Sequence, residues 1–470
     1  MSNNIDAVLA SRPAQVAFEK RRGDELQELY GALVKNSVYQ DKITLVDSTH
    51  IENNAGPSTS KSQPVPPNKK RTVSKPKTRP KKKTKRLEVR DIKRLPFDQK
   101  IHTLVGNFGS NNILNLASPG LIPERFQVEI QKIMKKLEIA LSLAANEQEK
   151  QLLIRFSNTK SLEDIESLVK SIPLVPQTGN FTFLSIALTK LIALWQSEVL
   201  LNHDHRETWF QMHVYGGLLD SAFLFDKNYN IKRSECHAST IKYLKKIKKI
   251  DDKEKDCKMD LILFNHGCGD MFTCEDKCES VSPGVVQNDF EKGSKLREKR
   301  LLYLKSIIPY KSNINHIEVL SAQFHGLTLT IYGSKMTEIG DIIHYQKAKA
   351  SIPTSPFNHL PQAAHYLLTV LSLQRNIVIN LKKLEIIFEA CLKDAVEYLA
   401  APISAINSNL FFREDSPGSE CSYESDTSDE FELEEQERRK TEYIDQEIKN
   451  LDKNDEGVLT ANDWESFIAE

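Results

Sequence analysis

Two apolar runs on either side of a glycine-bearing loop restrict the folds open to this chain more than any other feature. The first run is Met-Asp-Leu-Ile-Leu-Phe from Met259, and the second is Asp-Met-Phe-Thr-Cys-Glu-Asp-Lys, which ends at Lys277. The segment between them, Asn-His-Gly-Cys-Gly, holds two glycines. Short apolar runs around such a segment are typical of a β-hairpin. We predict a loop over 266–269, closed by Asn265 opposite Asp270.

This hairpin would bring three charged side chains together. Counting back from the closing pair places Asp260 opposite Glu275, and opposed residues share a face with their Cβ atoms ~5 Å apart. Lys277 lies on the same face because side chains alternate along a strand. Opposed like charges destabilise a sheet and shift pKa values unless a positive charge intervenes. A divalent cation would relieve the repulsion, and carboxylate oxygens suit Mg²⁺.

The spacing Asp-x14-Glu-x-Lys resembles the PD-(D/E)xK nuclease superfamily, whose fold is that of restriction endonucleases. The resemblance covers about residues 200–335, and Met259 stands where the family name has proline. It implies that Asp260 and Glu275 hold a catalytic metal and that Lys277 activates a water molecule. It also implies that the substrate is a phosphodiester, with DNA as the expected partner.

Several of these residues also have ordinary structural explanations. On a plain surface hairpin, Asp260 would be solvated and Glu275 would pair with a nearby lysine. By resemblance, Glu207 on the preceding helix is a further metal ligand; otherwise it is a surface glutamate. Gln323 either faces the site or is an amide at the edge of the core that is hydrogen-bonded to the backbone.

A row of basic residues follows the hairpin on a predicted helix over 294–308. Its leucines are expected to face inward and its lysines and arginines outward. Lys295, Arg297 and Arg300 are therefore candidates for contacts with DNA phosphates. The alternative is that this row is simply the solvated face of a helix.

The order of the predicted elements agrees with the resemblance. A helix, three strands, a second helix and further strands follow one another, which is the α-β-β-β-α-β order of the nuclease core. We expect a mixed α/β (α+β) fold with this core, a preceding helical region and charged tails. The elements are a helix from His205 to Ala222, a bent strand over Phe223–Phe225 and Tyr229–Arg233, the hairpin, a helix from Ser294 to Ile308, and strands at His316–Phe324 and Leu327–Tyr332.

Composition divides the 470 residues into folded and charged parts. A hydrophobic content of 40% supports a sizeable core, whereas the net charge of zero sums two opposed tails. The predicted parts are an N-terminal helical segment (1–50), a disordered basic linker (51–95), a helical region (96–204), the nuclease-like core with two C-terminal helices over 361–373 and 378–398 (205–401), a disordered acidic linker (402–440) and a helix-loop (441–470).

Two basic clusters in the first linker resemble a bipartite nuclear localisation signal. This predicts the nucleus as the location and a nuclear import receptor as a partner. Two alternatives are a tail that holds phosphates by charge alone, with salt-sensitive affinity, and a merely solvating linker. The residues of the clusters are Lys69, Lys70, Arg71, Lys81, Lys82, Lys83, Lys85 and Arg86.

Apolar residues recur every three or four positions before the hairpin, which predicts helices between residues 101 and 201. Ser161 begins one of them, because Ser-Leu-Glu-Asp is similar to a capping box. The segment 181–201 is more apolar and should be a buried helix. Whether these helices form a separate domain or a cap on the core is left open.

The segment 452–463 resembles an EF-hand calcium loop. Oxygen-bearing side chains stand at positions 1, 3, 5, 9 and 12, and glycine stands at position 6. A helix over 441–451 would enter the loop. Position 12 is an aspartate, shorter than the usual glutamate, which favours Mg²⁺-like binding over Ca²⁺. The alternative is a helix-loop end that binds no metal. The candidate ligands are Asp452, Asn454, Glu456, Asp463 and the carbonyl of Val458.

Cysteine usage and hydropathy indicate whether the chain belongs to the disulfide-rich, zinc-binding or membrane-spanning proteins. Seven cysteines, without a signal-peptide pattern at the first residues, favour reduced thiols over a disulfide framework. A zinc site is conceivable, but zinc modules favour closely spaced ligand pairs that recur. No run of eighteen apolar residues predicts a membrane span. The zinc candidates are His266, Cys268, Cys274 and Cys278.

Two functions from different classes follow. The first is a Mg²⁺-dependent nuclease that cuts DNA in the nucleus. The second is a catalytically inactive nuclear module that binds DNA or protein and responds to Ca²⁺ through residues 452–463. Cleavage that depends on Asp260 would distinguish the enzyme from the binding module.

Overall fold

The computed structural model describes residues 88–117, 122–172, 179–202, 204–224, 226–308, 311–356, 359–400, 427–453 and 458–459. The described residues from Leu95 onward belong to one compact unit, and those before it belong to another, which holds the short helix α3 (Val89–Lys93). The predictions of an N-terminal helix and of the basic clusters lie outside the described residues.

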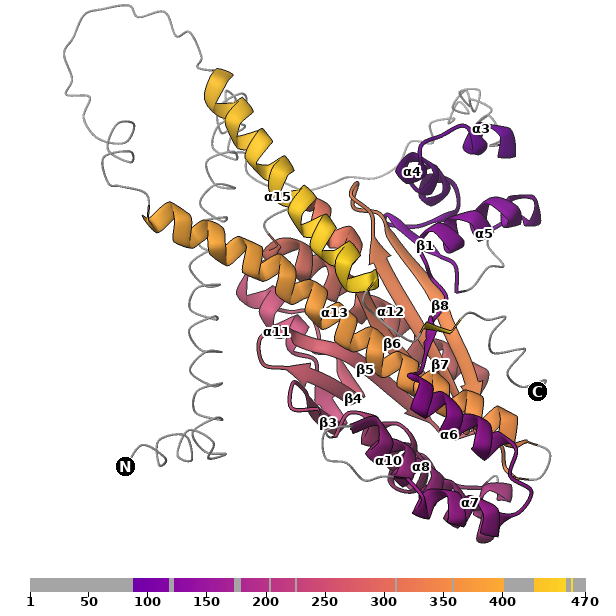
Figure 1. Cartoon of the computed structure of the whole chain (residues 1–470). Coiled ribbons are helices and arrows are strands. Elements are labelled where there is room, and N and C mark those ends of the chain that lie inside the picture. Colours follow the sequence, from indigo (N-terminus) through magenta and orange to yellow (C-terminus); the bar gives the residue numbers. More distant parts are fainter. Residues whose placement is uncertain are drawn as a thin grey trace, which may run out of the picture. The chain divides into compact units, whose positions relative to one another are not determined.

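A seven-stranded mixed sheet is the centre of the larger unit (Figure 1). Neighbouring strands are antiparallel except for two parallel pairs, β1 with β8 and β5 with β6. The expected mixed α/β class is therefore confirmed. In spatial order the strands are β1 (Ile113–Asn115), β8 (Ile342–Ser351), β7 (Thr328–Met336), β6 (Glu318–His325), β5 (Gly269–Lys277), β4 (Lys258–Asn265) and β3 (Asn230–His237).

Helix α12 (Pro283–Ile307) joins the parallel strands β5 and β6. Such strands need a long crossover, which a helix usually supplies. The predicted start at Ser294 is wrong, because the helix begins eleven positions earlier at Pro283. Proline suits the first helical position, where its missing N–H has no intrahelical partner. The additional turns at the start of α12 bring further side chains to the sheet.

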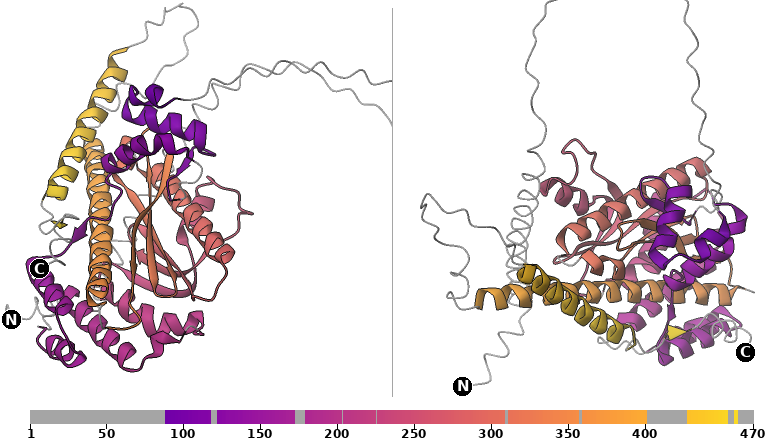
Figure 2. Two further views of the ribbon diagram at one scale, coloured as in Figure 1. Left: turned by 90° about the vertical axis from the view of Figure 1, so that its right-hand side faces the viewer. Right: turned by 90° about the horizontal axis from the view of Figure 1, so that it is seen from above.

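Helices cover both faces of the sheet (Figures 1 and 2). The long helix α13 (Leu360–Ala400) lies along one face, and α12 lies along the other. On the α12 side, Ile241 of helix α11 (Ser239–Lys246) and Leu296 pack with Met259 and Ile262 of β4. The prediction of two helices after residue 360 is wrong, because α13 is continuous.

The predicted helical region, residues 96–204, is largely helical, but it also contributes strand β1 to the sheet. Ser161 caps α7 through a capping box with Asp164, as expected, and the apolar helix α8 is largely buried. Its elements are α4 (Phe97–Phe108), η2 (Glu124–Phe126), α5 (Gln127–Lys136), the short strand β2 (Leu143–Ala144), α6 (Glu147–Ser157), α7 (Leu162–Lys170), α8 (Gly179–Gln196) and η3 (Val199–Leu201).

The expected single helix from His205 to Ala222 is broken into four short pieces. Gly217 allows this segment to pack closely against α8, because a Cβ at this position would lie 2.9 Å from the Lys190 side chain. Phe223 lies in a turn, so the first half of the predicted bent strand is wrong. The pieces are α9 (Glu207–Phe210), the π-helical turn η4 (Gln211–Tyr215), α10 (Gly216–Leu218) and η5 (Asp220–Ala222).

Helix α15 (Thr427–Lys453) begins inside the stretch predicted as an acidic disordered linker, so that prediction is wrong from residue 427 onward. Ile444 and Ile448 on α15 are buried, and Asp445 lies 2.7 Å from His316 of η6 (Lys311–His316). Strand β9 (Val458–Leu459), within the predicted EF-hand-like loop, pairs antiparallel with β2.

Most of the EF-hand-like segment lies outside the described residues. Asn454, Glu456 and Asp463 are among these, and the side chain of Asp452 is not described either. Of the helices in the described part of the chain, none combines the length and hydropathy of a membrane span.

Candidate active site on strands β4 and β5

The hairpin of β4 and β5 has the predicted register in its central part. Leu261 lies opposite Cys274, so the next pair outward consists of Asp260 and Glu275. The register changes near the turn, where Asn265 pairs with Gly269 instead of Asp270. The loop is thus one residue shorter than predicted.

Gly269 explains the shorter loop. Its φ of 81° is in the left-handed region, which glycine adopts without the strain that a Cβ would cause. A glycine in this region is typical of a β-bulge, and the register of the hairpin shifts between Leu263 and Phe264. The side chain of Asn265 also closes the turn by accepting hydrogen bonds from the N–H groups of Gly267 and Cys268, both at 2.8 Å.

Alternation along β5 separates two sets of charges. Glu275 contacts Lys292 of α12, whereas Asp276 points to the other side of the sheet and accepts a hydrogen bond from Arg233. The backbone N–H of Asp276 donates to the Asp260 carboxylate at 2.8 Å. Strand β5 therefore positions Asp260 by a hydrogen bond from its backbone. It positions Glu275 because this side chain points to the α12 side of the sheet.

Lys277 lies among three carboxylates, which include Asp260 of the predicted group but not Glu275. Its Nζ donates to Glu207 at 3.0 Å and lies 3.7 Å from Asp260 and 3.6 Å from Asp289. Burial lowers the pKa of Lys277, but Asp260, Glu207 and Asp289 outweigh that effect and raise the pKa overall. The ammonium form of Lys277 is thus stabilised by its surroundings.

Glu275 is 3% exposed, and its Oε1 lies 2.7 Å from Nζ of Lys292. Burial raises its pKa to about 8, even though Lys292 acts in the opposite direction. Asp260 and Asp289 add to the rise because a nearby negative charge disfavours ionisation. A divalent cation carries more positive charge than the Lys292 ammonium group, so it would favour the ionised form of Glu275.

Asp289 and Lys292 were not predicted as site residues. They lie on the first turns of α12, which the sequence-based boundary at Ser294 left outside the helix. Their spacing of three residues places both on one side of the helix. The signal that would have identified them is Pro283, which is typical of a helix start.

The donor set at this site fits a hard divalent cation. Oε1 of Glu275 and Oδ2 of Asp289 are buried and have no aligned hydrogen-bond donor. Carboxylate oxygens are the ligands that Mg²⁺ prefers. Within the described residues, no three His, Cys, Asp or Glu side chains form a ready metal site, and ammonium groups lie among these acids. Asp260 and Glu275 could hold Mg²⁺ once Lys292 moved aside.

Two of the three predicted phosphate contacts do not face solvent. Arg297 is 1% exposed and donates to the hydroxyls of Ser334, Ser321 and Ser294, and burial lowers its pKa to about 10. Arg300 is also buried and donates to the carbonyl of Cys268. The predicted outward orientation is therefore wrong for both arginines, because the helix packs this side against the sheet and the hairpin loop.

The third residue of that row, Lys295, is exposed as predicted. Gln323 lies beside Glu275 in the parallel register of β5 and β6. Its amide donates to the carbonyl of Val286 at 2.9 Å, as the structural alternative expected. Gln323 therefore links β6 to the start of α12 next to the site.

A second charge network supports the site from the other side of the sheet. Arg233 donates to both oxygens of Asp220, at 2.8 and 2.7 Å, and also to Asp276. Burial raises the pKa of Asp276 to about 7 despite Arg233. This network ties β3 to β5 and to the broken helix that carries Glu207.

In the described part of the chain, no three cysteine, histidine or acidic side chains cluster as metal ligands would. Cys236, Cys257, Cys268, Cys274 and Cys278 are free thiols. Burial raises the pKa of Cys274 and of Cys268, the latter to about 11. Thiols with raised pKa values are poor nucleophiles and poor zinc ligands.

The comparisons with known proteins leave the chain without a family assignment. No protein-family model, curated protein sequence or solved structure matches it. The geometry of this site is therefore the basis on which a function can be proposed.

Proposed function

We propose that this chain is a metal-dependent nuclease that hydrolyses DNA phosphodiesters in the nucleus. The observation that carries the proposal is that Asp260 and Glu275 lie on adjacent strands, next to the Leu261–Cys274 pair and close enough to affect each other's charge, with Nζ of Lys277 3.7 Å from Asp260. The succession of a helical segment, β3, β4, β5, α12 and β6 also resembles the core of the PD-(D/E)xK superfamily, apart from helix α11, which is inserted between β3 and β4. The basic clusters between residues 69 and 86 support import into the nucleus.

Each side chain has a defined role in this proposal. Asp260 and Glu275 would hold Mg²⁺, and Glu207 is the sequence-based candidate for a further ligand. When bound, Mg²⁺ supplies Lewis-acid stabilisation of charge on the phosphate and eases deprotonation of the attacking water. Lys277, kept protonated by its acidic neighbours, orients that water and offsets negative charge. Asp289 would position Lys277.

Cleavage of plasmid DNA tests this proposal. Wild-type protein in Mg²⁺ should convert supercoiled plasmid to nicked and linear forms, and EDTA should stop it. Asp260→Asn should lower the rate by about a hundredfold or more, because one aligned stabilising group is worth that much. Asp252→Asn changes an exposed acid before β4 and is the matched control, with the wild-type rate expected.

Equal cutting by wild type and Asp260→Asn would identify a contaminant and remove the proposed chemistry. A melting temperature for each variant, measured by circular dichroism, separates lost chemistry from lost folding.

A second candidate is a binding module without chemistry. The observation in its favour is that ammonium groups already stand beside the acids, with Lys277 3.7 Å from Asp260 and Lys292 2.7 Å from Glu275, where a metal would otherwise offset their charge. Tight DNA binding with no cleavage in Mg²⁺, Mn²⁺ or Ca²⁺ would support it. Calorimetric titration with Ca²⁺ would test whether residues 452–463 give this module a calcium response.

A further inference from the structure

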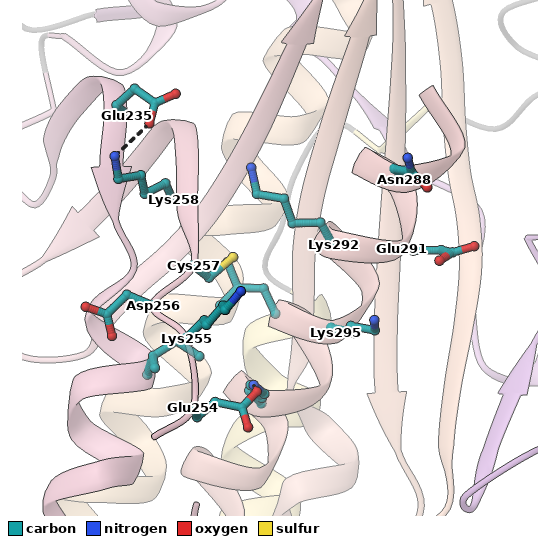
Figure 3. A pocket seen from close by; sticks show the side chains of 13 residues that line it. Glu235, Glu254, Lys255, Asp256, Cys257, Lys258, Asn288, Glu291, Lys292 and Lys295 are labelled. Atoms are coloured by element: carbon teal, nitrogen blue, oxygen red, sulfur yellow. Dashed lines mark hydrogen bonds and ion pairs between the residues drawn. The ribbon is translucent and has the colours of Figure 1, made fainter. Parts of the chain in front are cut away.

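A groove opens beside the candidate active site, between the segment that leads into β4 and helix α12 (Figure 3). Its volume is about 590 Å³, within the range of ligand-binding clefts. Side chains of residues 254–258 line one side, and side chains of α12 line the other. Lysine is the commonest residue in the lining: Lys255, Lys258, Lys292, Lys295 and Lys299.

Five lysines and four acidic residues line the groove, and two of the lysines have no carboxylate partner among the residues that the structure describes. Lys255 and Lys295 are exposed, and neither forms an ion pair with any residue in the described ranges. Lys258 pairs with the exposed Glu235 at 3.1 Å, and Lys299 pairs with Glu254. Exposed ion pairs of this kind are weak and are screened by salt. A polyanion can therefore replace these carboxylates at low cost.

Lys292 connects the groove with the candidate active site. It lines the groove, and its Nζ also contacts Glu275 at 2.7 Å. If Glu275 binds a metal ion, the metal offsets the negative charge of its carboxylate. The ion pair between Glu275 and Lys292 is then lost. Lys292 is then next to the reacting centre and free to contact a phosphate.

We propose that this groove binds the phosphate backbone of a nucleic-acid strand, and that Lys292 passes from Glu275 to a phosphate when strand and metal are both bound. The inference rests on the proposed function, because it takes the acids of β4 and β5 as the reacting end of the groove. The phosphodiester backbone, common to DNA and RNA, is the chemistry that is recognised. Ammonium groups along a cleft hold phosphates by charge and not by sequence.

Binding without cleavage tests the groove. Fluorescence anisotropy with labelled single-stranded DNA, single-stranded RNA and duplex DNA of equal length is measured in Ca²⁺ and in EDTA. The double variant Lys255→Glu with Lys295→Glu should weaken strand binding by about tenfold or more. It should also reduce the slope of log Kd against log salt by about 1.4, since each phosphate contact on a single strand contributes about 0.7.

The matched control carries the same charge change on other helices. Lys170→Glu with Lys382→Glu alters exposed lysines of α7 and α13, and we expect no more than a twofold effect. All variants are made in the full chain, and again in a full chain whose lysines and arginines at 69–86 are glutamine. Equal losses in the groove variant and the control would overturn the proposal. The probe whose binding is lost, DNA or RNA, identifies the source of the phosphates.

Lys292 receives its own test. Lys292→Gln should weaken strand binding about threefold or more in Ca²⁺, which occupies the acids, and should leave it unchanged in EDTA, where Lys292 stays on Glu275. Equal effects in the two conditions would contradict the transfer.

Failure of this inference differs from failure of the proposed function. Asp260→Asn should abolish cleavage and keep strand binding, whereas the groove variant should lose binding itself. Cleavage that depends on Asp260, with unchanged affinity in the groove variant, would leave the enzyme intact and place the strand elsewhere.

Discussion

At the scale of single residues, Lys277 and Glu275 hold their protons for opposite reasons. Lys277 keeps its proton because three carboxylates surround it, although burial works against the charge. Glu275 favours its neutral form because it is buried near other acids. Lys277 is therefore a source of positive charge at neutral pH, not a base. The titrating group of the proposed chemistry is Glu275.

The pKa of Glu275 predicts the pH dependence of cleavage. Because this pKa is raised to about 8, the carboxylate that would bind Mg²⁺ becomes populated only as pH rises toward that value. We expect the rate at subsaturating Mg²⁺ to increase between pH 6 and 8.5, about tenfold per unit at first. Rates measured across this range, with Mg²⁺ affinity at both ends, check it. A flat profile would contradict the assignment of Glu275.

The raised pKa of Glu275 also makes the stability of the folded protein depend on pH. The folded-state pKa of Glu275 lies above its ordinary value, so this group favours folding at low pH and loses that contribution as pH rises through about 8. A bound divalent ion should remove the loss, because it stabilises the ionised form. Melting temperatures at pH 9 should thus rise more on addition of Mg²⁺ than those at pH 6.

At the scale of elements, the hairpin of β4 and β5 is where sequence reasoning succeeded furthest. The two apolar runs and the glycine-bearing loop predicted the register that places Leu261 opposite Cys274, with Asp260 and Glu275 as the next residues outward. The bend after Leu263 was not predicted, because a bulge leaves no periodic signal. Helix α12 was misplaced because polar residues before Ser294 obscure its apolar face, and the buried Arg297 and Arg300 were read as surface charges. Strand β8 was missed altogether, since it lies outside the motif.

The hairpin loop gives a test at this scale. Gly269→Ala places a Cβ on a residue with φ of 81° and should lower the free energy of unfolding by about 1–2 kcal/mol. Gly267→Ala in the same loop is the control, because a Cβ there would meet only the Asn265 side chain, at 3.4 Å. Its effect should stay within about 0.5 kcal/mol. Urea unfolding curves of both variants give the comparison, and equal losses would contradict the turn geometry.

At the scale of the whole molecule, segments from distant parts of the sequence complete the larger unit. Helix α15 buries Ile444 and Ile448, Asp445 contacts His316, and β9 pairs with β2. Each buried isoleucine contributes about 1.5–3 kcal/mol. The predicted helix over 441–451, which holds both isoleucines, is confirmed within α15. The part of α15 before residue 441 was assigned to a linker, because its acidic composition hides its helical character.

These contacts predict how the protein behaves when its chain is cut. A specific protease site inserted between residues 401 and 426 would separate the C-terminal fragment covalently. We expect the fragment to remain bound after cleavage and to co-elute with the rest in size-exclusion chromatography. Ile444→Asp with Ile448→Asp should release it. Release of the unmutated fragment would show that these contacts are too weak to hold it.

Alternation along β5 has a consequence for how the length of this chain can change. Glu275 and Asp276 face opposite layers of the fold. A shift of the strand by one position would therefore put Asp276 on the side that Glu275 now faces, and it would also turn Lys277 toward the opposite layer. An added residue in the solvent-facing tip at 266–268 can be absorbed there, whereas one added between residues 270 and 275 cannot. Insertions and deletions should therefore be tolerated at residues 266–268, whereas those between residues 270 and 275 should abolish the proposed cleavage.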